Sequence, residues 1–116
     1  MITNKTKNRK IIEKTRMCTS TLCKGLGLMF RKKPDYGLVF VFDSEKKLGR
    51  TLTMMFVFYP IDVLFLDSKM KVVDKIDSFR PWTNYTPKRP SKYVIELPEG
   101  AAKGTSVGDA ISVSGL

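Results

Sequence analysis

The sequence predicts a mostly β (α+β) fold: a single compact antiparallel β-sandwich or distorted barrel with one short N-terminal helix. The chain has 116 residues, about the length that one hydrophobic core organises. Hydrophobic residues make up 42% of the chain, which is enough for a core and argues against wholesale disorder. Short runs of Val, Ile, Leu and Phe lie between turn residues, and this pattern is typical of strands.

The N-terminal segments carry the weakest patterns. Residues 1–10 hold one isolated apolar pair, so we expect a flexible basic arm there. The segment Ile11–Met17 is expected to form a first strand. Thr19 or Ser20 is expected to cap a short helix that runs to about Leu26, because a hydroxyl side chain can accept from the free N–H groups of a first turn.

Residues 11–116 are expected to form the single β-rich domain. Pro60 lacks a backbone N–H and therefore separates two of its strands, and the turn Asp67-Ser68-Lys69 is expected to close a hairpin. Several runs are apolar on both faces, which indicates that they lie between two layers. The predicted strands are Gly37–Phe42, Leu52–Phe58, Ile61–Leu66, Met70–Asp77, Tyr93–Leu97 and Ala110–Val113.

Positive charge is concentrated near the N-terminus. Residues 1–33 carry ten basic side chains and one acidic side chain, whereas residues 34–116 carry eleven basic and ten acidic ones. Such asymmetry has two interpretations: a contact with nucleic acid or a membrane surface, or a solvated basic face that aids solubility.

Composition excludes several kinds of site. The chain has no histidine, which removes His-based zinc sites and catalysis by Ser-His-Asp or Cys-His groups. Cys18 and Cys23 have no metal-binding or redox spacing, so neither metal nor cofactor is predicted. The sequence shows no signal peptide and no apolar run of the roughly 20 residues that a spanning helix needs. We therefore expect a cytoplasmic protein with reduced thiols.

The segment 79–93, FRPWTNYTPKRPSKY, is the strongest candidate for ligand or nucleic-acid binding. It is long for a connection without regular structure, and such loops tend to carry function. Cations and aromatic rings alternate in it, as in proteins that stack bases and track phosphates of single strands. The competing interpretation is that the rings cap an open end of the core. The candidate binding residues are Arg80, Trp82, Tyr85, Lys88, Arg89 and Lys92.

Asp62 is the second candidate, because it lies in an otherwise apolar run. An ionised carboxylate buried there needs a partner, and Arg31 can hold a carboxylate with two parallel hydrogen bonds. This pair is either an internal clamp or the lining of a small-molecule pocket. Glu96 alternates with Ile95 and Leu97, so we expect it to face solvent or to lie on a sheet edge.

Four ordered segments resemble the family called domain of unknown function 192. They are LGLMFRKKPDYGLVFVF at 26–42, YPIDVLFLD at 59–67, SKYVIELPEG at 91–100 and GD at 108–109. The resemblance implies a compact β-rich fold with one N-terminal helix and implies no activity. Many bacterial members have tryptophan, methionine, lysine, asparagine and threonine where this chain has residues 53–57, TMMFV, so any role of that lysine and asparagine does not transfer.

No pair of carboxylates is brought together by sequence spacing, and no catalytic residue is predicted. We therefore interpret the chain as a small basic binding module rather than an enzyme, with weak nonspecific nucleic-acid association through the N-terminal arm and the 79–93 loop. The alternative is a small-molecule-binding protein or an enzyme that uses a pocket near Arg31 and Asp62.

Overall fold

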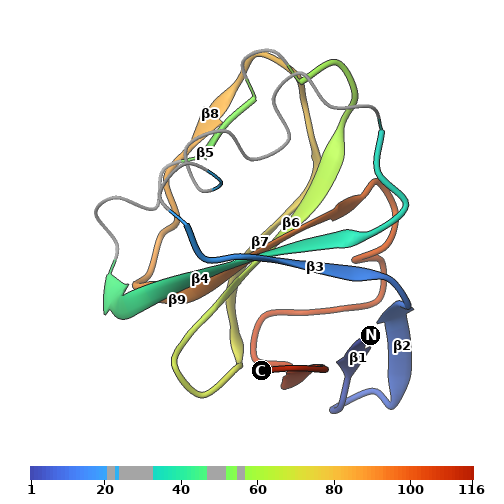
Figure 1. Cartoon of the computed structure of the whole chain (residues 1–116), viewed down its shortest axis with the longest axis vertical. Coiled ribbons are helices and arrows are strands. Elements are labelled where there is room, and N and C mark those ends of the chain that lie inside the picture. The colour runs from blue at the N-terminus through green and yellow to red at the C-terminus, as the bar shows by residue number, and fades with distance from the viewer. Residues whose placement is uncertain (21–22, 24–32, 47–51, 55–56) are drawn as a thin grey trace.

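The computed structural model describes residues 1–20, 23, 33–46, 52–54 and 57–116. Its described elements are strands, which form two main sheets and a two-stranded ribbon (Figure 1). The strands are β1 (Ile2–Asn4), β2 (Arg9–Ile12), β3 (Thr15–Cys18), β4 (Gly37–Lys46), β5 (Leu52–Thr53), β6 (Ile61–Leu66), β7 (Val72–Phe79), β8 (Asn84–Tyr85), β9 (Ser91–Pro98) and β10 (Ile111–Val113).

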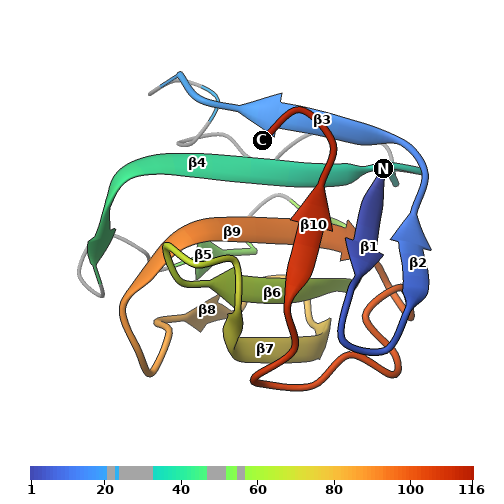
Figure 2. The same cartoon turned by 90° about the horizontal axis from the view of Figure 1, so that it is seen from below.

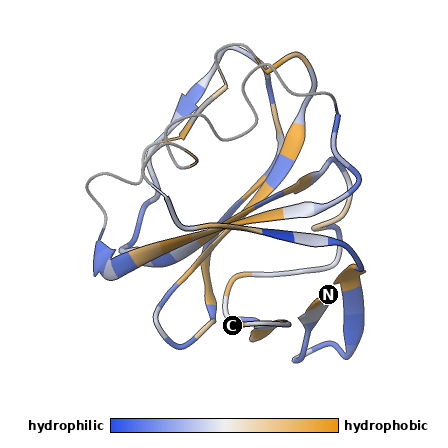
Figure 3. Cartoon of the chain, in the orientation of Figure 1, coloured by the Kyte–Doolittle hydropathy of each residue, from blue (hydrophilic) through white to orange (hydrophobic). Residues whose placement is uncertain are grey.

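The five-stranded sheet has the order β3-β4-β9-β6-β7. β3 runs parallel to β4, and the other neighbours are antiparallel. All six residues of β6 are buried, because β6 is an inner strand and both faces of the sheet are covered. This explains the unbroken apolar run around Asp62. Figure 3 shows the apolar residues concentrated along the crossing strands at the middle of the molecule.

The second sheet, β10-β1-β2, joins the two ends of the chain and packs across the first (Figure 2). Ile2 pairs with Val113 and has no exposed surface. The prediction of a flexible arm over residues 1–10 is therefore wrong. This segment is fixed by a strand pairing and by Asn4, whose side-chain amide donates to Asp109 at 2.8 Å.

Two apolar layers cover the faces of the five-stranded sheet. One lies against the β10-β1-β2 sheet and includes Ile2, Leu64 and Ile95. The other lies on the opposite face, beneath the β5-β8 ribbon, and includes Phe65 and Phe79. Neither main sheet closes on itself in the part of the chain that the structure describes. The fold is therefore a sandwich and not a closed barrel.

Most predicted strands of the domain are confirmed. The strand Ile61–Leu66 has the predicted bounds, and it forms the expected hairpin with β7 through the turn at Asp67. The expected strand Ile11–Met17 is divided between β2 and β3. Within the expected strand Leu52–Phe58, the residues that the structure describes contain β5, and residues 55–56 lie outside them.

The expected N-terminal helix falls almost wholly outside the described residues. The Ser20 hydroxyl does accept a hydrogen bond from the backbone N–H of Cys23 at 3.1 Å, which is the contact expected of a cap. Cys18 and Cys23 are joined by a disulfide, so the expectation of two reduced thiols is not met.

Candidate functional site

Two aromatic side chains stand out from the described surface. Phe58 is 65% exposed and Trp82 is 54% exposed, and their ring centroids lie 5.9 Å apart in an edge-to-face arrangement. They come from the two segments that flank the β5-β8 ribbon, and we call them the aromatic pair. Large rings are rarely left in water without a reason, so this pair marks a candidate contact surface.

The backbone fixes the position of Trp82. Its φ angle is 65°, in the left-handed region that a bulky residue seldom adopts. The Trp82 N–H donates to the carbonyl of Met54 at 3.0 Å, and the Met54 N–H donates to the carbonyl of Thr83 at 2.8 Å. The Thr83 hydroxyl also donates to the carbonyl of Arg80. The turn therefore fixes the backbone at Trp82, and the indole lies exposed at the surface.

Of the six residues predicted in the 79–93 loop, four lie exposed on the surface: Arg80, Trp82, Lys88 and Arg89. Lys92 is half-buried on β9, and its ammonium lies 5.6 Å from the centre of the Tyr93 ring. The loop thus brings three exposed cations and one exposed ring to the same stretch of chain.

Tyr85 faces inward and is not available for stacking. Its ring packs against Phe65 and Phe79 in the core. Its hydroxyl donates to Asp74 at 2.6 Å, and desolvation, reinforced by this hydrogen bond, raises the pKa of Tyr85 to about 12. Phe79 is buried in the core beside Tyr85, whereas Trp82 lies outside the core.

Asp62 is buried, as predicted, and its described partners are backbone amides. One carboxylate oxygen accepts from Ser78 at 3.0 Å, and the other accepts from Gly100 and Ala102 at 2.9 Å each. Arg31 lies outside the described residues, so its pairing with Asp62 stays a prediction. The amides alone give the carboxylate the partners that its burial requires.

A surface pocket of about 290 Å³ nevertheless lies beside Asp62. Ser78 lines it with a φ angle of 54°, and the Ser78 hydroxyl donates to Glu99 at 2.7 Å. Lys103 also lines the pocket, as do Lys75 and Asp77, which form a salt bridge at 3.1 Å. Its lining residues are of charged or polar types apart from Gly100 and Gly104, which suits a small ligand with polar groups.

Glu96 is the residue whose environment was predicted wrongly. It is 5% exposed, and its Oε1 atom has no hydrogen-bond partner within the described part of the chain. Desolvation raises the pKa of Glu96 to about 8. The sequence did contain a signal. Val94, Ile95 and Leu97 place apolar side chains on both faces of β9, which indicates that both faces are covered and that Glu96 is buried as well.

Part of the positive charge of the N-terminal segment is used in a contact within the fold. Lys7 donates to Asp109 at 2.8 Å, and this contact together with Asn4 lowers the pKa of Asp109 to about 2. Within the described residues there is no cluster of three Cys, Asp or Glu side chains that could hold a metal ion. The same part of the chain contains no helix long and apolar enough to span a membrane.

Comparison with known proteins places the chain among uncharacterised relatives. The family DUF192, described as "Uncharacterized ACR", matches residues 2–113. A UPF0127 protein of Pyrococcus horikoshii is 41% identical over 100 residues, which are 86% of this chain and 85% of that protein. A UPF0127 protein of Pyrococcus furiosus is 40% identical over 104 residues, which are 90% of this chain and 88% of that protein.

Two solved structures share the fold. A proposed transcription regulator of Sinorhizobium meliloti 1021 aligns with a TM-score of 0.78 and 27% identity, over 88% of this chain and 82% of its own. A protein of unknown function from Novosphingobium aromaticivorans aligns with a TM-score of 0.83 and 21% identity, over 97% of this chain and 81% of its own. The four ordered segments, the family match and these relatives agree: the chain belongs to the uncharacterised DUF192 family.

Proposed function

We propose that this chain is a binding module that holds single-stranded nucleic acid on the aromatic pair, Phe58 and Trp82. The exposed edge-to-face arrangement of the two rings is the observation that carries the proposal. Each ring offers a face on which a base can stack, and such stacking contributes about 1–3 kcal/mol per base without regard to sequence.

Positive charge in the same loop as Trp82 supports the same partner. Arg80 lies two residues before Trp82, and Lys88 and Arg89 end the same loop, all three exposed. The chain as a whole carries a formal charge of +10. Cations beside stacked bases neutralise phosphates and release counterions, so binding that uses them weakens as salt rises.

The fixed backbone around Trp82 favours binding over incidental exposure. A left-handed φ at a bulky residue costs free energy, and such conformations cluster where a side chain must be presented. Because hydrogen bonds already hold the backbone at Trp82, a ligand does not have to order this turn. The solved relative described as a proposed transcription regulator is compatible with a nucleic-acid partner.

The test is a binding series with a fluorescein-labelled oligothymidylate, measured by anisotropy at low salt. Trp82→Ala and Phe58→Ala are each expected to weaken binding by about 1–3 kcal/mol, which is about 5- to 150-fold. Val107→Ala is the matched control, because Val107 is another exposed apolar side chain, 58% exposed, on the turn before β10. Equal losses in all three variants, or unchanged affinity in Trp82→Ala, contradict the proposal.

A second candidate function is small-molecule binding in the pocket beside Asp62. The observation that favours it is the strained Ser78, whose hydroxyl faces Glu99 in that pocket. Asp62 itself would act by holding the pocket wall through Gly100 and Ser78 rather than by touching a ligand. Ser78→Gly keeps the backbone conformation and removes the hydroxyl, so it should abolish ligand-induced thermal stabilisation without lowering the melting temperature of the free protein.

A further inference from the structure

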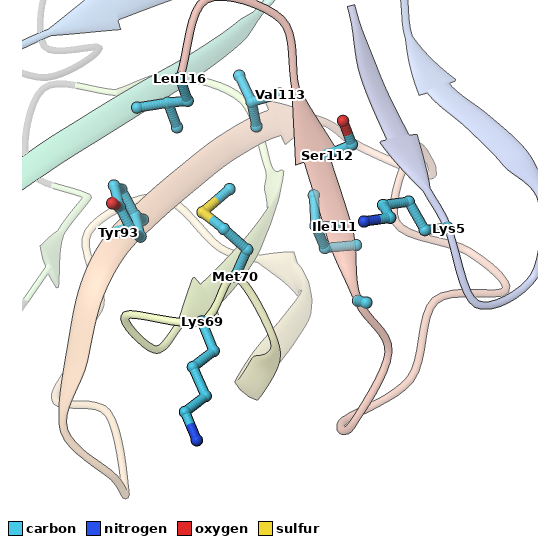
Figure 4. A pocket seen from close by; sticks show the side chains of 9 residues that line it. Lys5, Lys69, Met70, Tyr93, Ile111, Ser112, Val113 and Leu116 are labelled. Carbon is cyan, nitrogen blue, oxygen red and sulfur yellow. The ribbon is translucent and has the colours of Figure 1, made fainter.

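A second pocket, of about 280 Å³, lies where β10 faces the turn between β6 and β7. Its lining combines Lys5, which follows β1, with Lys69 and Met70 of the turn and Tyr93 of β9. Figure 4 shows Met70 and Tyr93 on one side of the opening and β10 on the other. The other lining residues are Ala110, Ile111, Ser112, Val113 and Leu116. Its size suits a small ligand, since pockets for drug-sized molecules start at about 300 Å³.

Met70 occupies a backbone position that favours a different residue. Its φ angle is 65°, and its N–H donates to the carbonyl of Asp67 at 3.1 Å, so it closes a short hairpin loop. Glycine or asparagine takes this left-handed conformation with less strain. The chain instead places a long thioether there, and that side chain is half-buried and lines the pocket. The Met70 side chain thus packs against the core layer and at the same time forms part of the pocket wall.

The apolar wall of the pocket suits an aromatic or aliphatic group. The Met70 thioether is flexible and makes favourable contacts with aromatic rings. Tyr93 is half-buried and packs at the margin of the core layer that contains Ile111 and Val113. A ring placed between Met70 and Tyr93 would cover apolar surface that the fold leaves partly open to water.

The charge at the rim is positive. The lining contains Lys5 and Lys69 and no acidic side chain, and neither ammonium forms a salt bridge with any residue that the structure describes. Figure 4 shows the Lys5 side chain reaching toward Ile111, whereas Lys69 extends away from the apolar wall. The nearby carboxylate of Asp67 is engaged by backbone N–H groups of Lys69 and Lys71, at 2.9 and 3.0 Å.

We propose that this pocket binds a small aromatic carboxylate. The ring lies between Met70 and Tyr93, and the carboxylate accepts from Lys5, with Lys69 adding long-range attraction. An amphipathic anion uses both the apolar wall and the lysine ammonium groups of the lining. The site shares no residue with the aromatic pair, so its test is independent of the proposed nucleic-acid function.

Three probes with one shared ring system isolate the role of charge. 3-Phenylpropanoate, 3-phenylpropan-1-ol and 3-phenylpropylammonium are titrated separately into the ¹⁵N-labelled full chain, and amide shifts are followed by NMR. The carboxylate is expected to shift the amides of Lys5, Met70 and Tyr93 and those of β10 in a saturable way. The alcohol should bind more weakly and the ammonium should not bind. Because the indole of Trp82 lies elsewhere, its signal should stay unchanged.

Variants separate the two halves of the site. Lys5→Gln is expected to lower the affinity for the carboxylate by about two- to fivefold, the usual range for an exposed charge pair. Its affinity for the alcohol should stay unchanged. Met70→Gly is expected to weaken both probes by about tenfold, because it removes apolar contact, while the folded state keeps its backbone conformation. Lys10→Gln is the matched control on β2, and Met70→Asn serves if the glycine variant does not fold.

Saturable carboxylate binding at the pocket amides with the expected order of probes supports the assignment. Two results overturn it: shifts spread over the whole surface that do not saturate, or equal affinity for the carboxylate and the ammonium. Unchanged carboxylate affinity in both Lys5→Gln and Met70→Gly also overturns it.

Discussion

The Oδ2 atom of Asp62 accepts a hydrogen bond from the backbone N–H of Gly100 at 2.9 Å. This contact joins two of the segments that carry the family resemblance, YPIDVLFLD and SKYVIELPEG. Ala102 donates to the same oxygen, and Ser78 donates to Oδ1. Asp62 therefore holds the turn after β9 and the end of β7 against β6 through backbone amides.

Asp62→Ala is expected to destabilise the fold by about 3–5 kcal/mol, because it leaves three N–H groups without their charged acceptor. Asp43→Ala, at an exposed carboxylate of β4, is the control and should change stability by roughly 0.5 kcal/mol or less. Urea denaturation measures both. Similar midpoints for the two variants would show that Asp62 is not a clamp.

Glu96→Gln is expected to stabilise the protein above neutral pH. The pKa of Glu96 is about 8 in the folded chain, against 4.5 as its ordinary value. The folded state therefore keeps a proton that the unfolded state loses, and stability falls as pH rises from about 5 to 8. The fall is about 1.4 kcal/mol per pH unit for one such group.

Denaturation at pH 5, 6, 7 and 8 measures this slope in the natural chain and in Glu96→Gln. The variant should lack the contribution of this group and exceed the natural chain in stability at pH 8. Glu99→Gln, on the exposed turn nearby, should keep the natural slope. Parallel pH profiles for the natural chain and Glu96→Gln contradict a buried, protonated Glu96.

Asp109 gives the opposite pH dependence. Its pKa is about 2, lowered mainly by the hydrogen bonds from Lys7 and Asn4, against 3.8 as its ordinary value. Its contribution to stability is present above about pH 4 and is lost as pH falls toward 2. Asp109→Asn should lower the melting temperature at pH 7 and reduce the difference between pH 4 and pH 2. An unchanged melting temperature at pH 7 rules out this anchoring of the N-terminal segment.

Reduction of the Cys18–Cys23 disulfide is expected to lower stability by about 2 kcal/mol, the loop-closure value for a link across a few residues. Thermal unfolding with and without tris(2-carboxyethyl)phosphine measures the change. The double variant Cys18→Ser with Cys23→Ser should be insensitive to the reductant. If the natural chain is equally insensitive, the two thiols are not linked in solution.

Local patterns predicted the inner strands and the C-terminal strand well and the N-terminal end poorly. Ile61–Leu66 could be delimited from sequence because its apolar run is bounded by Pro60 and Asp67. β1 could not, because its partner Val113 lies at the other end of the chain, and a two-residue apolar pattern does not reveal so distant a pairing.

Local patterns left parts of the candidate sites undecided for similar reasons. The exposure of Trp82 was one of two stated alternatives, and a local pattern could not decide between them, since Phe58 comes from a separate segment. Glu96 was misplaced because alternation indicates a solvent face only on a strand with one covered side. The pocket at Met70 depends on a backbone conformation that composition does not encode.

Trp82 fluorescence is the most direct test of nucleic-acid binding at the aromatic pair, because the chain contains a single tryptophan. The free protein is expected to show the red-shifted emission of an exposed indole. Oligothymidylate at about 50 mM salt should quench this emission, and raising salt to about 200 mM should largely restore it as phosphate contacts weaken. Emission that ignores the oligonucleotide at both salt concentrations contradicts the account.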